Sequence, residues 1–388
     1  MFMPDRRPTP AQPTPDIKYA GTAVPTSTAL PFQRDAELWE EDGNVILVAT
    51  LPSVSGSTGP SSVACPKTGF LVQQTVLSVQ SQLWERLFSN RRNENENMEH
   101  GAVPVYELSD SAENLRDLLH HLNRQPNLSN DTPYLGGWTK LCTLLASILR
   151  LATKYEMRAL RQEVITVLER DWPRTLPSWD DNEREIQHRI ALYWQSGRTV
   201  STLAATELDQ LGPEPATIVS LALECNVASI LPAAFYHLNR VYQVPKAHKL
   251  LSIPGPQNRT FIPHLLPEHV LHALLLGRES LARFASEARF NTDDLSTSFT
   301  ASGDTTCCAG VRTWWQDVGV RRVSEGPWRL DPLQGIERMV REIEDENSPR
   351  DICVNCRVKL RGSLVNLRTE LWNRLPRWFR VDAPSITL

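Results

Sequence analysis

The chain lacks the features that would assign it to a membrane or secreted class. None of its apolar runs approaches the about 20 residues that a membrane-spanning helix requires. Its first residues pass directly into Pro- and Thr-rich sequence, without the apolar segment of a secretory signal peptide. Its seven cysteines are an odd number, which argues against a secreted disulfide framework. We therefore expect a soluble intracellular protein, cytoplasmic or nuclear, that has no membrane partner.

Catalytic and nucleotide-binding motifs are absent as well. The sequence contains no Gly-x-Ser-x-Gly, His-Glu-x-x-His, Gly-x-x-x-x-Gly-Lys-Ser/Thr or Gly-x-Gly-x-x-Gly pattern. It also has no repeat of fixed period, so kelch, ankyrin and similar arrays are not indicated. These absences predict a protein that is not an enzyme.

The charges of the chain are nearly balanced. A net charge of −4 creates no global field that favours nucleic acid or an anionic membrane. The C-terminal segment is basic and contains Trp372 and Trp378, a combination that can contact nucleic acid. The acidic run Glu342–Glu346 precedes it and can neutralise it within the fold. No zinc-finger or homeodomain pattern is present, so we expect a solvated helix face and not a nucleic-acid partner.

Ordered structure is expected to begin at residue 34. Residues 1–33 are rich in Pro and Thr and cannot bury enough apolar surface to offset chain entropy, so they predict a disordered tail. The continuous run Val45–Leu51 is typical of a buried strand, and Phe70–Val72 predicts a second strand. Apolar residues at helical spacing then indicate a helix over 76–88.

A further strand and three helices complete this region. Val103–Leu108 predicts the strand, and Ser109–Glu113 contains the capping signal of the helix that follows it. Two more helices are predicted over about 138–155 and 158–171. The order strand, strand, helix, strand and three helices predicts an α+β domain, a small sheet covered by helices.

Three short motifs accompany this order of elements. They are the strand start Asp42-Gly-Asn44, the hairpin exit Phe70–Leu77 and the helix sequence Leu151–Glu156. Together they resemble the BTB/POZ domain, in particular that of the expanded BTB family of mushroom-forming (basidiomycete) fungi. The resemblance implies a BTB/POZ fold over residues 34–172 and, more loosely, an all-α C-terminal domain over residues 173–388.

BTB domains bring proteins together, and they commonly pair through the first helix and an exchanged edge strand. The resemblance therefore implies an adaptor that dimerises with itself or with other BTB proteins, including a substrate adaptor for a cullin-type ubiquitin ligase. The alternative is a scaffold or transcriptional co-regulator without a role in ubiquitin transfer. The apolar side chains expected at the dimer surface are Phe70, Val76, Leu83, Trp84 and Phe88. Large apolar side chains on one short helix can serve either a core or an interface, and both interpretations stay open.

The sequence after Pro173 has helical periodicity. Apolar residues at helical spacing predict several helices between residues 180 and 287. The last and longest helix is expected over Ser348–Leu375, with Ser348 as its N-cap and Pro349 in its first turn.

Two pairs of cysteines in this region form a candidate structural zinc site. Cys353 and Cys356 have the C-x-x-C spacing that supplies half of such a site, because tetrahedral Zn²⁺ takes thiolates about one turn apart. Cys307 and Cys308 would supply the other half, although adjacent cysteines usually point apart. Cys356 also fits the apolar stripe of its helix, where a thiol packs as a small hydrophobe. With zinc bound, the C-terminal region would be a zinc-stabilised binding domain. The alternative is that the chain has no cofactor and the four cysteines are core or near-surface thiols.

Overall fold

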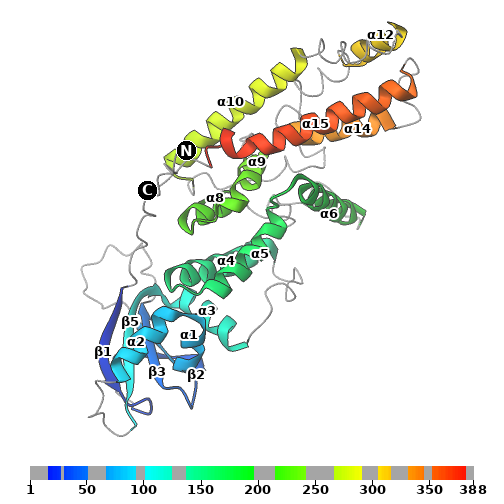
Figure 1. Ribbon diagram of the computed structural model, residues 1–388. Helices are drawn as coiled ribbons and strands as arrows, with labels where there is room; N and C mark the ends of the chain where they lie inside the picture. Colours follow the sequence, from blue (N-terminus) through cyan, green and yellow to red (C-terminus); the bar gives the residue numbers. More distant parts are fainter. Residues whose placement is uncertain are drawn as a thin grey trace, which may run out of the picture. The chain divides into compact units, whose positions relative to one another are not determined.

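The chain folds into two compact units, residues 1–167 and 168–388. A computed structural model describes residues 16–27, 30–50, 67–92, 101–124, 137–195, 215–241, 266–290, 305–315, 331–344 and 352–381. The first unit combines a sheet with helices, whereas all the elements described in the second unit are helical (Figure 1). The mixed α+β class expected from the sequence is thereby confirmed.

The first unit is built on a five-stranded sheet with the strand order β1-β5-β3-β4-β2. Its strands are β1 (Ile17–Ala23), β2 (Gln33–Trp39), β3 (Val45–Thr50), β4 (Lys67–Val72) and β5 (Val103–Ser111). β3 and β4 are antiparallel, and β5 runs parallel to β3. β1 pairs antiparallel with β5, and β2 pairs parallel with β4. Every residue of β3 except the last is buried, which explains its continuous apolar sequence.

Part of the predicted N-terminal tail is ordered. We expected residues 1–33 to be disordered, but residues 17–23 form β1. Half-buried and exposed residues alternate along β1, the pattern of a strand with one face on the protein. Tyr19 on the half-buried face contacts the ring of Tyr106 in β5 edge-on, with the ring centroids 5.7 Å apart. The sequence prediction missed β1 because it was based on the Pro- and Thr-rich composition of the whole segment and not on the alternation within residues 17–23. Residues 1–15 lie outside the described part.

The first unit also contains five helices, two of them between β4 and β5 and three after β5. They are α1 (Gln74–Gln80), α2 (Gln82–Arg92), α3 (Ala112–Arg124), α4 (Gly137–Lys154) and α5 (Arg158–Asp171). The sequence predicted a single helix over 76–88, but the chain becomes extended at Ser81. The Ser81 hydroxyl donates to the carbonyl of Tyr155 (2.5 Å) and accepts from the Trp84 N–H (3.3 Å). This serine therefore ends α1 and caps α2.

The second unit contains seven described α-helices, besides a short 3-10 helix at Ala228–Ile230. They are α6 (Leu176–Gln195), α8 (Pro215–Glu224), α9 (Leu231–Val241), α10 (Glu268–Phe290), α12 (Thr305–Trp314), α14 (Pro332–Glu344) and α15 (Val354–Trp378). α14 and α10 lie beside α15, which also contacts α9 and α12 (Figure 1). The apolar stripe predicted along α15 is buried, from Cys356 through Leu364 to Leu375.

The start of α15 differs from its prediction. The sequence placed Ser348 at the N-cap, but Cys353 is the N-cap residue and the helix begins at Val354. The first backbone hydrogen bond of the helix runs from the N–H of Arg357 to the carbonyl of Cys353 (3.0 Å). Ser348 and Pro349 lie outside the described residues.

Gly277 allows α10 to approach the C-terminal end of α15. A Cβ atom at this position would lie 2.1 Å from the ring of Phe379, which is fully buried and stacks on Phe235. We expect Gly277→Ala to destabilise the protein by about 1–3 kcal/mol, because the ring or the helix has to shift. Thermal unfolding of the full chain measures this effect.

Gly362 provides the matched control for this substitution. It lies on the exposed side of α15, and a Cβ atom there would meet nothing within 4 Å. Gly362→Ala should therefore stabilise the helix by about 0.5–1 kcal/mol. Equal effects of the two substitutions would contradict the close packing of α10 against Phe379.

Candidate interaction surface and buried charge network

Three of the five side chains expected at an interface belong to the core of the first unit. Phe70, Trp84 and Phe88 are all buried, with 0%, 1% and 8% of their surface exposed. The Trp84 ring stacks on Phe88 (centroids 5.4 Å apart) and lies 5.2 Å from the ring of Tyr155. Side chains enclosed in this way cannot contact a partner, so the expected interface has to be corrected at these positions.

The other two expected residues lie at the surface. Val76 on α1 and Leu83 on α2 are half-buried, and so is Leu87 one turn after Leu83. Val79, one turn after Val76, is 83% exposed, the highest fraction of any large apolar side chain in the described residues. We call Val76, Val79, Leu83 and Leu87 the α1–α2 apolar group. Two of its members, Val76 and Leu83, belong to the expected interface, and the structure adds Val79 and Leu87.

β1 is the second accessible feature of the first unit. It forms one edge of the sheet, and an edge strand offers backbone groups with which another chain can pair. The pairing of β1 with β5 shifts register between Tyr19 and Gly21, where Gly21 has φ 107°. A glycine tolerates this left-handed conformation, and the resulting bulge interrupts a regular edge.

The second unit contains a buried charge network centred on Arg240 of α9. This arginine is 1% exposed and forms a bidentate pair with Glu183 of α6 (Nη1–Oε1 2.8 Å, Nη2–Oε2 2.7 Å). Its Nε lies 2.7 Å from Oδ2 of Asp331, as an ion pair outside hydrogen-bond geometry. Burial alone would lower the pKa of Arg240, but the charges of Asp331 and Glu183 outweigh it and raise the pKa above its usual value.

Asp331 also organises the start of α14. Its Oδ1 accepts hydrogen bonds from the hydroxyl of Tyr236 (2.8 Å) and from the N–H of Gln334 (3.2 Å). The same hydroxyl accepts from the N–H of Leu333 (3.0 Å). Burial and the nearby Asp331 charge raise the pKa of Tyr236 well above its usual value, so its phenol stays neutral and donates to the carboxylate. Asp331 therefore acts as the N-cap of α14 and as a counter-ion of Arg240.

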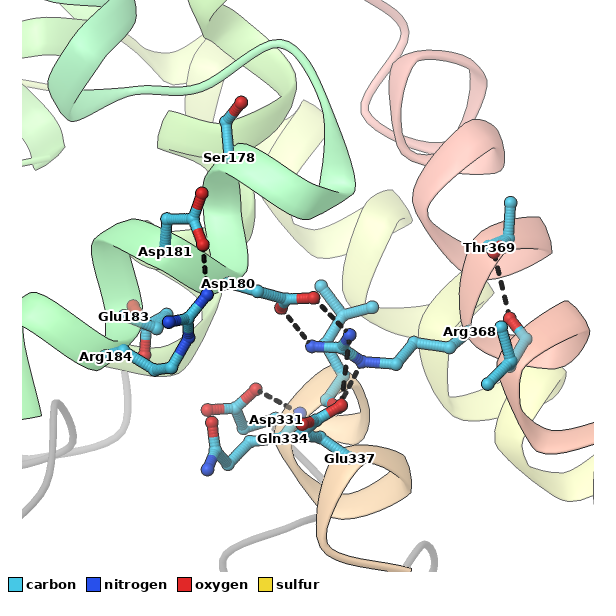
Figure 2. A network of polar contacts seen from close by, with 12 residues as sticks. Ser178, Asp180, Asp181, Glu183, Arg184, Asp331, Gln334, Glu337, Arg368 and Thr369 are labelled. Carbon is cyan, nitrogen blue, oxygen red and sulfur yellow. Dashed lines mark hydrogen bonds and ion pairs between the residues drawn. The ribbon is translucent and has the colours of Figure 1, made fainter. Parts of the chain in front are cut away.

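Arg368 of α15 forms a second centre of charge. It makes a bidentate pair with Asp180 of α6, one arm of which joins Nη1 to Oδ2 at 2.6 Å. Its Nη1 also lies 3.3 Å from Oε2 of Glu337 in α14, and its Nε donates to the carbonyl of Leu333 (3.0 Å). Figure 2 shows the side chains of the three helices converging on this guanidinium. Both arginines are thus neutralised within the fold, and the network acts as a cross-link between helices.

Sequence reasoning missed this network. It placed the basic C-terminal segment, which contains Arg368, on a solvated helix face, whereas Arg368 is buried and pairs with the half-buried Asp180. The burial of Arg368 could have been predicted, because Arg368 lies four residues after Leu364 and therefore falls in the apolar stripe of α15. A charged residue at a core position is retained there only with a partner. On the exposed side of α15, Arg361 pairs with Glu344 (2.5 Å), which agrees with the expected neutralisation by the preceding acidic run.

The predicted zinc ligands lie at the starts of two helices. Cys353 is exposed at the N-cap of α15, and Cys356 is buried three residues later. Cys307 and Cys308 are in the first turn of α12, which contacts α15, but their side chains lie outside the described residues. No group of three or more His, Cys, Asp or Glu side chains comes together as a metal site within the described stretches. The four-thiolate site remains a prediction.

Comparison with known proteins returns no relative of this chain. No family model, curated protein or solved structure matches it. The helices in the described ranges also include none with the length and apolarity needed to span a membrane. Function is therefore inferred from the residues and geometry of the chain itself.

Proposed function

We propose that this chain is a protein-binding adaptor that self-associates through its first unit. The observation that carries the proposal is the α1–α2 apolar group, with Val79 projecting into solvent. Apolar side chains at the surface of a folded unit favour contact with another protein. The edge position of β1 supports the same conclusion, since the BTB/POZ resemblance implies pairing through a helix and an exchanged edge strand.

The order of elements gives further support to the BTB/POZ resemblance. After β2 the chain forms the hairpin β3–β4, then α1 and α2, then β5 parallel to β3, and then three helices. This is the order that the resemblance implies, apart from the additional strands β1 and β2 and the division of the first helix at Ser81. In this proposal the first unit contacts a cullin-type scaffold and the helical unit binds the substrate protein, inside the cell.

Self-association makes a direct prediction for the α1–α2 apolar group. The double variant Val79→Glu, Leu83→Glu should weaken dimerisation by roughly 30-fold or more, because loss of a central apolar contact costs about 2 kcal/mol and burying carboxylates costs more. Sedimentation equilibrium of the full chain at micromolar concentration measures the effect. Val358→Glu is the matched control, since Val358 is exposed on α15 in the other unit. A wild-type chain that is monomeric in this range contradicts the proposal.

The adaptor role is tested separately from self-association. Affinity purification of the full chain after crosslinking in its own cells should recover a cullin, and substitutions on the exposed faces of α3 and α4 should abolish that recovery. Recovery of only self-copies, other BTB proteins or chromatin factors would favour the alternative, a scaffold or transcriptional co-regulator. A structural zinc at the four cysteines is compatible with either role, and metal analysis of the purified chain decides it.

A further inference from the structure

A pair of cysteines with opposite exposure marks the start of α15. Cys353 is the N-cap residue with an extended backbone (φ −68°, ψ 161°), and Cys356 is the third residue of the helix. The Cys353 side chain is exposed, whereas Cys356 is only 3% exposed. One thiol is thus accessible to a reactant in solution, and the other is enclosed one helical turn away.

The N-cap and the third helical residue lie one helical turn apart. In a capping box, the side chains at these two positions reach across to the backbone of the other residue, which shows that they share one side of the first turn. Helical residues three apart have Cβ atoms about 5–6 Å apart, and a disulfide needs about 3.5–4.5 Å. The N-cap residue lies outside the helical backbone, so disulfide formation requires Cys353 to move toward Cys356.

We propose that Cys353 and Cys356 form a redox-active dithiol that is oxidised by low-molecular-weight disulfides. The Cys353 thiolate attacks one sulfur of the reagent, forms a mixed disulfide and releases the other half as a thiolate. Cys356 then gives up its proton and attacks the Cys353 sulfur, which releases the second thiol and closes the Cys353–Cys356 disulfide. Two protein thiols are oxidised and one small disulfide is reduced to two thiols. This reaction is independent of the binding function proposed for the first unit.

The two cysteines have distinct roles, which makes the proposal testable on the full chain. The reduced protein is incubated with glutathione mixtures of increasing oxidised fraction, quenched by alkylation and mapped by peptide mass spectrometry. We expect an intramolecular Cys353–Cys356 disulfide in the wild type, and a stable glutathione adduct on Cys353 in Cys356→Ser. Cys353→Ser should leave Cys356 reduced, because the buried thiol is not accessible to the reagent. In the reduced chain, Cys353 should be alkylated at least about tenfold faster than Cys356.

The control is Cys225→Ser, which removes another buried thiol of the helical unit. It should leave disulfide formation unchanged, and circular dichroism checks that all variants keep the helical content of the wild type. The proposal is overturned if Cys353 stays reduced in excess oxidised glutathione, or if it pairs with Cys307 or Cys308. It is also overturned if one zinc ion per chain protects both thiols from alkylation, which would support the metal site instead.

Discussion

Replacing Arg240 by methionine is expected to destabilise the helical unit by about 3–5 kcal/mol. The loss does not come mainly from the missing attraction. It arises because Glu183 and Asp331 are both buried against Arg240 and would be left without a counter-charge. Urea unfolding of the full chain, combined with hydrogen exchange of the amides in α6 and α9, measures the effect in the unit where it should occur.

A matched control separates burial from charge. Arg283→Met removes an arginine of α10 that pairs with Glu279, but both of these side chains are 66% exposed. Its effect should stay below about 0.5 kcal/mol. The double variant Arg240→Met, Glu183→Leu should be more stable than Arg240→Met alone, since it also removes one of the stranded carboxylates. If Arg240→Met behaves like Arg283→Met, the network does not hold the unit together.

The network joins segments that are distant in sequence, and this suggests what it contributes. Glu183 and Arg240 are 57 positions apart, and Asp180 and Arg368 are 188 positions apart. Buried ion pairs add little net stability compared with apolar side chains, but any other arrangement of the helices would leave charges unpaired in the interior. We infer that the two arginines select one arrangement of α6 against α9, α14 and α15.

The sequence predicted those parts of the fold that depend on local pattern. The β-branched run of β3 and the apolar stripe of α15 were visible because each repeats at the period of its own element. The break at Ser81 was not, because it depends on a hydrogen bond to the carbonyl of Tyr155, 74 positions away. The same holds for Arg240, whose buried position becomes intelligible only once Glu183 and Asp331 are beside it. Contacts between residues that are distant in the sequence produce no periodic pattern, so they cannot be predicted from the spacing of residues.

Three of the five residues predicted at the interface, Phe70, Trp84 and Phe88, lie in the core for a related reason. Apolar residues of α1 and α2 lie both inside the unit and at its surface, and helical spacing alone does not say which side faces the sheet. Trp84 and Phe88 are buried, whereas Val79 is exposed and Val76, Leu83 and Leu87 are half-buried. The size of the side chains gives some indication of which residues are buried, since the two aromatic residues of this segment, Trp84 and Phe88, are both in the core.

Trp84→Ala tests this division of roles and should destabilise the first unit by about 3–5 kcal/mol. Trp84 packs against Phe88, Tyr106 and Tyr155, so its removal leaves a large cavity among aromatic rings. Hydrogen exchange of the α2 and β5 amides measures the loss. Trp84→Phe should cost much less, because the indole N–H has no hydrogen-bond partner in the described part of the chain.

The exposed Val79 gives the opposite expectation on the neighbouring helix. Val79→Ala should change stability by less than about 0.5 kcal/mol, because its side chain is 83% exposed. In sedimentation, however, Val79→Ala should shift the chain toward monomer, whereas Trp84→Phe should not. A Trp84→Ala variant that keeps its stability but no longer self-associates would return Trp84 to the interface and overturn the assignment of Trp84 and Phe88 to the core.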